Sequence, residues 1–73
     1  MRDELIACLR RVPFAPFIVA LKTGEVYSVR GVERLSVASY LWTVVDQAGS
    51  LRVHSFQAIE SIVTGGGGDS GNA

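Results

Sequence analysis

The spacing of the apolar residues changes near Pro16, and this change limits the chain to a small set of folds. From Leu5 to Val12, apolar side chains recur every three to four residues, which is typical of one face of a helix. From Phe17 onward, apolar and other residues alternate, which is the period of a strand. The pattern therefore predicts one short N-terminal helix followed by strands.

The charges around the first apolar stripe support a helix there. Asp3 can cap the helix, and Asp3 and Glu4 lie at the end where the helix dipole favours acids. Arg10 and Arg11 lie at the other end, and Pro13 stops the helix. A helix this short has no stability of its own, so its apolar face must pack against the rest of the chain.

Five short, strongly bent antiparallel strands are predicted after the helix, separated by turn residues. Thr23-Gly24 predicts a hairpin turn, residues 46–49 predict another, and residues 56–59 predict one helical turn. In some 60 residues, that many strands bury a core only by curling into a small barrel of the Sm-like or SH3-like kind. The predicted strands are residues 16–22, 25–30 continuing through a bend at Gly31 into 32–37, then 40–45, 51–54 and 60–63.

The glycine-rich end of the chain, residues 65–73, is of low complexity and predicts a disordered tail. The remaining domain, residues 1–64, is small enough to be only marginally stable by itself. It contains seven basic and six acidic residues, so its net charge gives no electrostatic signature of a nucleic-acid-binding protein.

Several classes of protein are excluded by what the sequence lacks. A single cysteine cannot form an internal disulfide, and one cysteine with one histidine cannot form a closed zinc site. The N-terminus does not resemble a secretory signal, and Pro13 and Pro16 interrupt an apolar run too short to span a membrane. We therefore expect a cytoplasmic protein with no cofactor, no metal and no membrane partner.

The predicted strand edges have little protection against pairing with another chain. The last strand, residues 60–63, carries one charge, and residues 40–45 carry none. Edge strands usually carry lysine or proline to prevent such pairing. A chain with unprotected edges either aggregates or pairs those edges in a closed ring, and we expect the ring.

The motifs along residues 5–63 resemble those of a group of small bacterial proteins. The resemblance is specific for that group and implies no function. The shared motifs are a double Pro-Phe signature at residues 13–17, a strand and turn at residues 18–24, a Val-Val-Asp-x-x-Gly hairpin at residues 44–49 and an Ile-x-x-Ile strand at residues 59–62.

The order of the elements is also similar to the Sm-like barrel of bacterial Hfq-type RNA chaperones, most closely at residues 16–24 and 55–63. This resemblance implies a homo-oligomeric ring. In such rings the fourth strand of one subunit, here residues 51–54, pairs with the fifth strand of the next, here residues 60–63. The implied subunit-interface residues are Leu51, Val53, His54, Ile62 and Val63.

The same resemblance implies candidate RNA contacts near the helix exit and before the central strand. Arg10 and Arg11 lie close to where the family has a basic rim, and the alternative is that they only offset the helix dipole. Tyr40 and Trp42 match the segment in which the family stacks a base on an aromatic ring. Two residues apart on a strand, they share a face, so core or interface packing is the alternative.

The loop before the last strand departs from the family pattern. Phe56 and Gln57 are the residues nearest to the positions where the family has a Lys-His pair that binds uridine-rich RNA. Two hypotheses therefore stand. The first is a non-enzymatic Sm-like ring that binds RNA, and the second is a protein-interaction or scaffolding module that binds no nucleic acid.

An enzyme is not expected. Cys8, His54 and Asp46 are the residue types of a catalytic triad, but nothing in their spacing supports one. Cys8 lies on the apolar stripe of the helix, where a cysteine usually behaves as a small hydrophobic residue.

Overall fold

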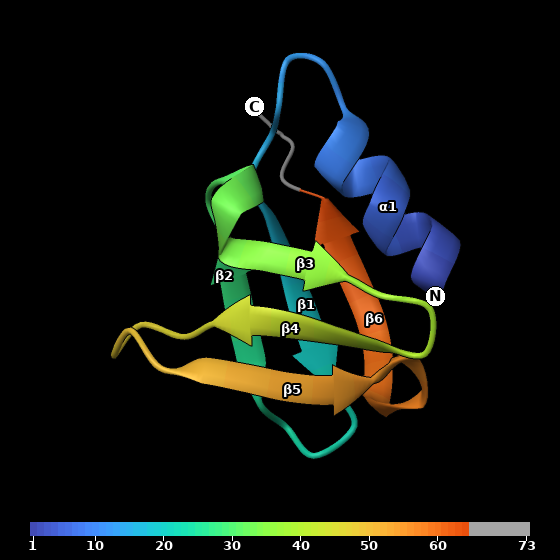
Figure 1. The fold of residues 1–73 in the computed structure, drawn as a ribbon, viewed down its shortest axis with the longest axis vertical. Coiled ribbons are helices and arrows are strands. Elements are labelled where there is room, and N and C mark those ends of the chain that lie inside the picture. The colour runs from blue at the N-terminus through green and yellow to red at the C-terminus, as the bar shows by residue number, and fades with distance from the viewer. Residues whose placement is uncertain (65–73) are drawn as a thin grey trace.

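One helix precedes six strands in the computed structural model, which describes residues 1–64 (Figure 1). The tail predicted over residues 65–73 lies outside the described residues. In chain order the elements are α1 (Arg2–Arg10), β1 (Phe17–Leu21), β2 (Val26–Val29), the 3-10 helix η1 (Val32–Arg34), β3 (Leu35–Val37), β4 (Leu41–Val45), β5 (Leu51–Ser55), the 3-10 helix η2 (Phe56–Ala58) and β6 (Ile59–Thr64).

The strands form two three-stranded antiparallel sheets, with the orders β2-β1-β6 and β3-β4-β5. The prediction of a mostly β chain with one N-terminal helix is therefore confirmed. The single five-stranded sheet is not observed, and neither of the two sheets is closed. Closure of the strands into a barrel stays a prediction.

The two sheets separate at η1. The backbone N–H of Arg34 donates to the carbonyl of Gly31 at 3.1 Å, which turns the chain where one long bent strand was expected. The first half of the predicted segment 32–37 is thus a 3-10 turn, and only Leu35–Val37 is strand. As a result, β2 and β3 belong to different sheets.

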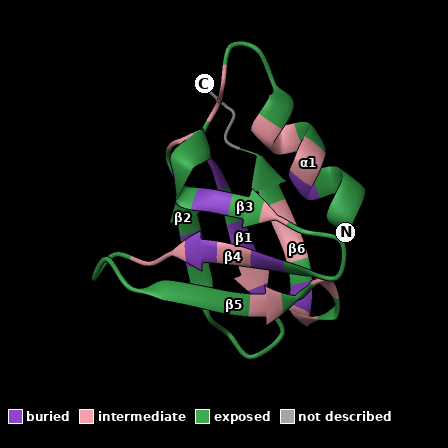
Figure 2. Ribbon diagram, viewed as in Figure 1, coloured by how far each residue is buried: buried purple, intermediate pink, exposed green. Residues whose placement is uncertain are grey.

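The core lies between the sheets and is built from alternate residues of the strands. Phe17, Val19 and Leu21 of β1 are buried, as their period of two predicts, and β4 adds Trp42 and Val44 (Figure 2). No polar or charged residue is buried among residues 1–64. The core therefore depends on apolar burial, at roughly 25 cal/mol for each Å² removed from water.

The helix packs against the core through a shorter stripe than the sequence predicts. Leu5 is fully buried, and Cys8 and Leu9 are partly buried against the same cluster (Figure 2). Val12 was expected to continue this stripe but is 93% exposed. The reason is that α1 ends at Arg10, so Val12 lies in the connection that leads to β1.

Both predicted glycine turns are confirmed. Gly24 and Gly49 have φ angles of 98° and 86°, in the left-handed region that glycine adopts at no steric cost. The second turn joins β4 to β5 and is fixed by Asp46. Its carboxylate accepts a hydrogen bond from the Ser50 N–H at 2.8 Å and pairs with the Arg52 guanidinium at 3.1 Å.

Replacing Asp46 with alanine is expected to reduce stability in a pH-dependent way. The hydrogen bond from Ser50, followed by Arg52, holds the pKa of the Asp46 carboxyl below its ordinary value of 3.8. Because the folded state favours the ionised form, its stabilisation is complete at neutral pH and is lost as the pH falls through the lowered pKa. Thermal unfolding of both proteins from pH 7 downward should show a gap that closes in acid.

A matched control for this prediction is Glu60→Ala, which removes an exposed carboxylate from β6. Glu60 has no salt bridge within residues 1–64, so its loss should change the melting temperature little at any pH. A gap between wild type and Asp46→Ala that stays constant or widens in acid would contradict the prediction.

Candidate functional site

On strand β5 the polar side chains lie on the side of the sheet that faces the core, and the apolar side chains lie on the side that faces solvent, which is the reverse of the usual arrangement. Cross-strand partners share a face of a sheet, so Arg52 and His54, which pair with the buried Val44 and Trp42, lie on the inner side. Leu51 and Val53 consequently lie on the outer side, where they are 65% and 57% exposed. The predicted interface residues Leu51 and Val53 thus form an apolar surface that residues 1–64 leave uncovered.

These apolar side chains lie on strands at the open edges of the two sheets. Strand β5 pairs only with β4, and β6 pairs only with β1, so each leaves one row of backbone groups unpaired within residues 1–64. On β6, Val63 is 54% exposed, whereas Ile62 packs against the core. Figure 1 shows the two edge strands meeting at the short η2 connection.

His54 lies on the core-facing side of β5. Its Nε2 atom lies 2.8 Å from the hydroxyl oxygen of Tyr27, and its ring packs on Trp42 with centroids 5.2 Å apart. The Tyr27 hydroxyl also donates to a Glu25 carboxylate oxygen at 3.5 Å. Burial, with a smaller effect of Glu25, raises the pKa of Tyr27, so its hydroxyl remains protonated at neutral pH. His54 thereby links the two sheets by a side-chain hydrogen bond.

The structure separates Tyr40 from Trp42, which were expected to share a face. Trp42 is fully buried, and its indole N–H donates to the Ser55 carbonyl at 2.9 Å. The alternative of core packing therefore holds for Trp42, and its ring has no face free to stack on a base. Tyr40 precedes β4 rather than belonging to it, and it is 89% exposed. Of the two aromatic residues, only Tyr40 is available to a ligand.

Tyr40 and the loop of Phe56 and Gln57 lie at the same end of the β4–β5 pair. Leu41 is opposite Ser55 in the sheet, so Tyr40 and Phe56 leave the paired region together. Phe56 is half-buried and Gln57 is exposed. The structure therefore brings three of the six candidate RNA contacts to one end of the molecule.

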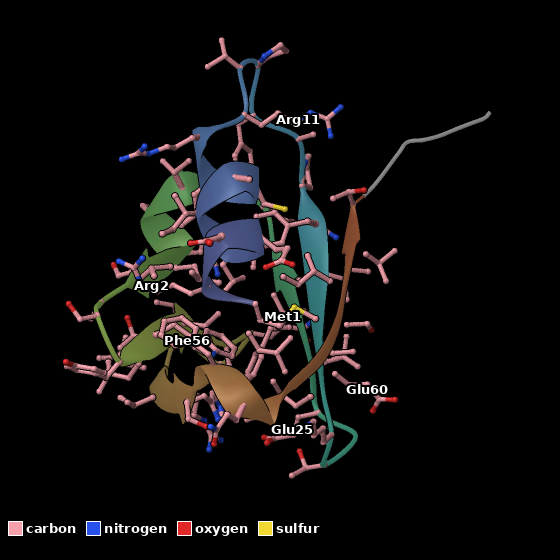
Figure 3. The ribbon with its side chains drawn as sticks, turned by 90° about the vertical axis from the view of Figure 1, so that its right-hand side faces the viewer. Met1, Arg2, Arg11, Glu25, Phe56 and Glu60 are labelled. Atoms are coloured by element: carbon pink, nitrogen blue, oxygen red, sulfur yellow. The ribbon has the colours of Figure 1, made fainter. Side chains whose placement is uncertain are left out.

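Arg10 and Arg11 lie away from this end. They are exposed at the far end of α1, and a nine-residue helix is about 13 Å long. Figure 3 shows Arg11 at the opposite end of the helix from Arg2 and Phe56. Arg2 is the arginine near Tyr40, because its Nε donates to the Ala38 carbonyl at 3.1 Å. The charge pattern of the helix singled out Arg10 and Arg11, and the packing of the helix adds Arg2.

No protein-family model, curated protein or solved structure matches this chain. Within residues 1–64, no helix is long and apolar enough to cross a membrane. In the same part of the chain, no three His, Cys, Asp or Glu side chains gather closely enough to hold a metal ion.

The residues of the hypothetical triad have other partners. His54 contacts Tyr27 and Trp42, while Asp46 is held by the Ser50 N–H and Arg52. Burial raises the pKa of the Cys8 thiol, which keeps it in the protonated, weakly nucleophilic form at neutral pH. Cys8 packs beside the core under α1, as expected of a small hydrophobic residue.

Proposed function

We propose that this protein is a non-enzymatic, Sm-like or SH3-like barrel that assembles with copies of itself into a ring through the edges of β5 and β6. The observation that carries the proposal is the outward-facing apolar surface of Leu51 and Val53 at an open sheet edge. An exposed apolar edge strand is a site at which another strand pairs. Covering it removes both apolar surface and unpaired backbone groups from water.

A strand of a second copy is the occupant that the fold itself supplies. Strand β6 offers its own open edge with Val63 exposed, and pairing it with β5 of a neighbour would extend the β3-β4-β5 sheet. The two edges are different surfaces of one chain, so the contact is head-to-tail. Head-to-tail contacts repeat from copy to copy, and they end in a ring when the rotation closes.

The mass of the protein in solution tests this assembly. Light scattering should give a multiple of the single-chain mass that persists on dilution into the micromolar range. A monomer with an intact β spectrum would overturn the proposal. A mass that grows with concentration and does not level off would indicate open filaments in place of a ring.

RNA is the ligand that we propose for the ring, bound at the end that carries Tyr40. An 89% exposed tyrosine with Arg2 held beside its loop combines a stacking surface with a cation. Gln57 adds an exposed amide at the same end of β5. Repetition of this weak site around a ring would raise its overall affinity.

The second candidate function is a protein-interaction module, which the same exposed apolar edge supports.

Tyr40→Ala is expected to weaken RNA binding about tenfold, because stacking contributes about 1–3 kcal/mol for each base. The measurement is filter binding of short uridine-rich and adenine-rich RNA at low and moderate salt. Wild-type binding should be micromolar and should weaken steeply with salt. Tyr40→Phe keeps the aromatic ring and should bind nearly as well as wild type. No binding by wild type at either salt would reject the RNA proposal in favour of the protein-interaction module.

A further inference from the structure

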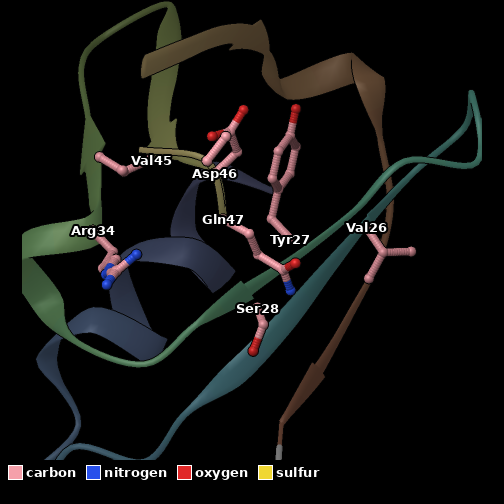
Figure 4. A pocket seen from close by; sticks show the side chains of 8 residues that line it. Val26, Tyr27, Ser28, Arg34, Val45, Asp46 and Gln47 are labelled. Atoms are coloured by element: carbon pink, nitrogen blue, oxygen red, sulfur yellow. The ribbon is translucent and has the colours of Figure 1, made fainter. Parts of the chain in front are cut away.

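Two hollows open between β2 and the β4–β5 turn, away from the edges of β5 and β6. Each has a volume of about 270 Å³. They share Ser28, Arg34 and Gln47 in their linings, so they are two parts of one groove. Figure 4 shows these three side chains around the same space. No residue of β5 or β6 lines the groove, so the proposed ring would leave it open.

One half of this groove is lined by Ser28, Arg30, Arg34 and Gln47 alone. Ser28 and Arg30 are two residues apart along the strand direction and therefore lie on the same side, while Tyr27 and Val29 point into the core. The η1 turn then returns the chain and adds Arg34. The half-groove thus has two guanidinium groups, one hydroxyl and one amide, and no carboxylate.

These two arginines are free to bind a ligand. Neither Arg30 nor Arg34 takes part in a salt bridge within residues 1–64. The acid in the adjoining half, Asp46, is paired with Arg52 at 3.1 Å, so its charge is already compensated. A guanidinium fork matches the oxygens of phosphate in geometry as well as in charge, and hydroxyl and amide groups donate to the same oxygens.

The other half of the groove suits an uncharged group attached to that phosphate. Val26, Val45 and Ala48 contribute apolar surface there, whereas Tyr27 borders the same space but is nearly fully buried. Small-molecule sites combine such surface with a few converging polar groups, and their volumes begin near 300 Å³. We propose that the groove binds a small phosphate monoester, with its phosphate between Arg30 and Arg34 and its uncharged body against Val26 and Val45.

The test is a titration of the full chain, followed through the amide NMR signals of Ser28 and Gln47. Adenosine monophosphate is the first probe, inorganic phosphate is the second, and adenosine tests the body without the charge. Saturable shifts with the monophosphate, competition by phosphate and at least tenfold weaker binding of adenosine are expected. Absence of saturable shifts with either phosphate probe at millimolar concentration would overturn the proposal.

Arg34→Gln and Arg30→Gln are each expected to weaken binding of the monophosphate about tenfold, because each removes a charge-assisted hydrogen bond. Arg11→Gln makes the same change at an exposed arginine outside the groove and should bind as wild type does. Equal losses in all three variants would overturn the proposal in favour of a general charge effect. A second outcome would also overturn the proposal. If Arg34→Gln loses RNA binding and the wild-type protein shows no saturable binding of the monophosphate, the groove binds the RNA backbone instead.

Discussion

Trp42→Ala is expected to unfold most of this protein at room temperature, while Tyr40→Ala leaves its stability almost unchanged. Trp42 is fully buried and packs on Tyr27 and His54, with ring centroids 6.2 and 5.2 Å away. Truncating a buried tryptophan to alanine costs about 3–5 kcal/mol. A core of about 60 residues rarely supplies more than that in total.

Urea unfolding measures this difference. It is followed by far-ultraviolet circular dichroism, because the Trp42→Ala variant has no tryptophan fluorescence to follow. Tyr40→Ala is the matched control, since it removes an exposed aromatic ring two residues away and should shift stability by at most about 0.5 kcal/mol. Trp42→Phe separates packing from hydrogen bonding. It keeps an aromatic ring but loses the N–H bonded to the Ser55 carbonyl, at a cost of about 1 kcal/mol or more. Equal effects of Trp42→Ala and Tyr40→Ala would contradict the core described here.

The elements that follow local rules could be predicted from the sequence. The alternation from Phe17 to Leu21, the positive-φ glycines at Gly24 and Gly49, and the helical turn after Ser55 all depend on neighbouring residues. The sequence gives no such local signal at residues 32–34, where apolar and charged residues suit a strand or a turn equally. The hydrogen bond that decides between them joins Gly31 to Arg34 and produces two sheets in place of one.

The candidate site depended on contacts between distant parts of the chain, which pattern alone does not predict. The same-face rule failed for Tyr40 and Trp42 because β4 begins at Leu41, one residue after the tyrosine. Arg2 reaches the Tyr40 loop only because α1 packs with its first turn beside Ala38. The one signal available in advance was the order Leu-Arg-Val-His at residues 51–54. Its alternation predicts a strand with one apolar face, but whether that face is inside or outside is set by the register with β4.

Val63→Asp is expected to convert the oligomer to single chains. Val63 lies 54% exposed on the open edge of β6, beside Ile18 of β1. In the proposed ring, its side chain would pack beside the apolar side chains of the neighbour's β5 on the same face of the joined sheet. Burying a carboxylate there without a partner costs several kcal/mol for each interface. Because every interface of the ring carries the substitution, light scattering should report the mass of one chain.

The fold of this variant should survive, because Val63 lies outside the buried core. Circular dichroism should therefore show an unchanged β spectrum, which separates loss of assembly from unfolding. Val12→Asp makes the same change at a 93% exposed valine in the connection after α1, and it should leave the oligomer intact. Val53→Asp, on the complementary β5 edge, should dissociate the protein as Val63→Asp does. A Val63→Asp protein that keeps its full mass would show that β6 is not the contact, and the exposed apolar edge of β5 would then belong to a different partner.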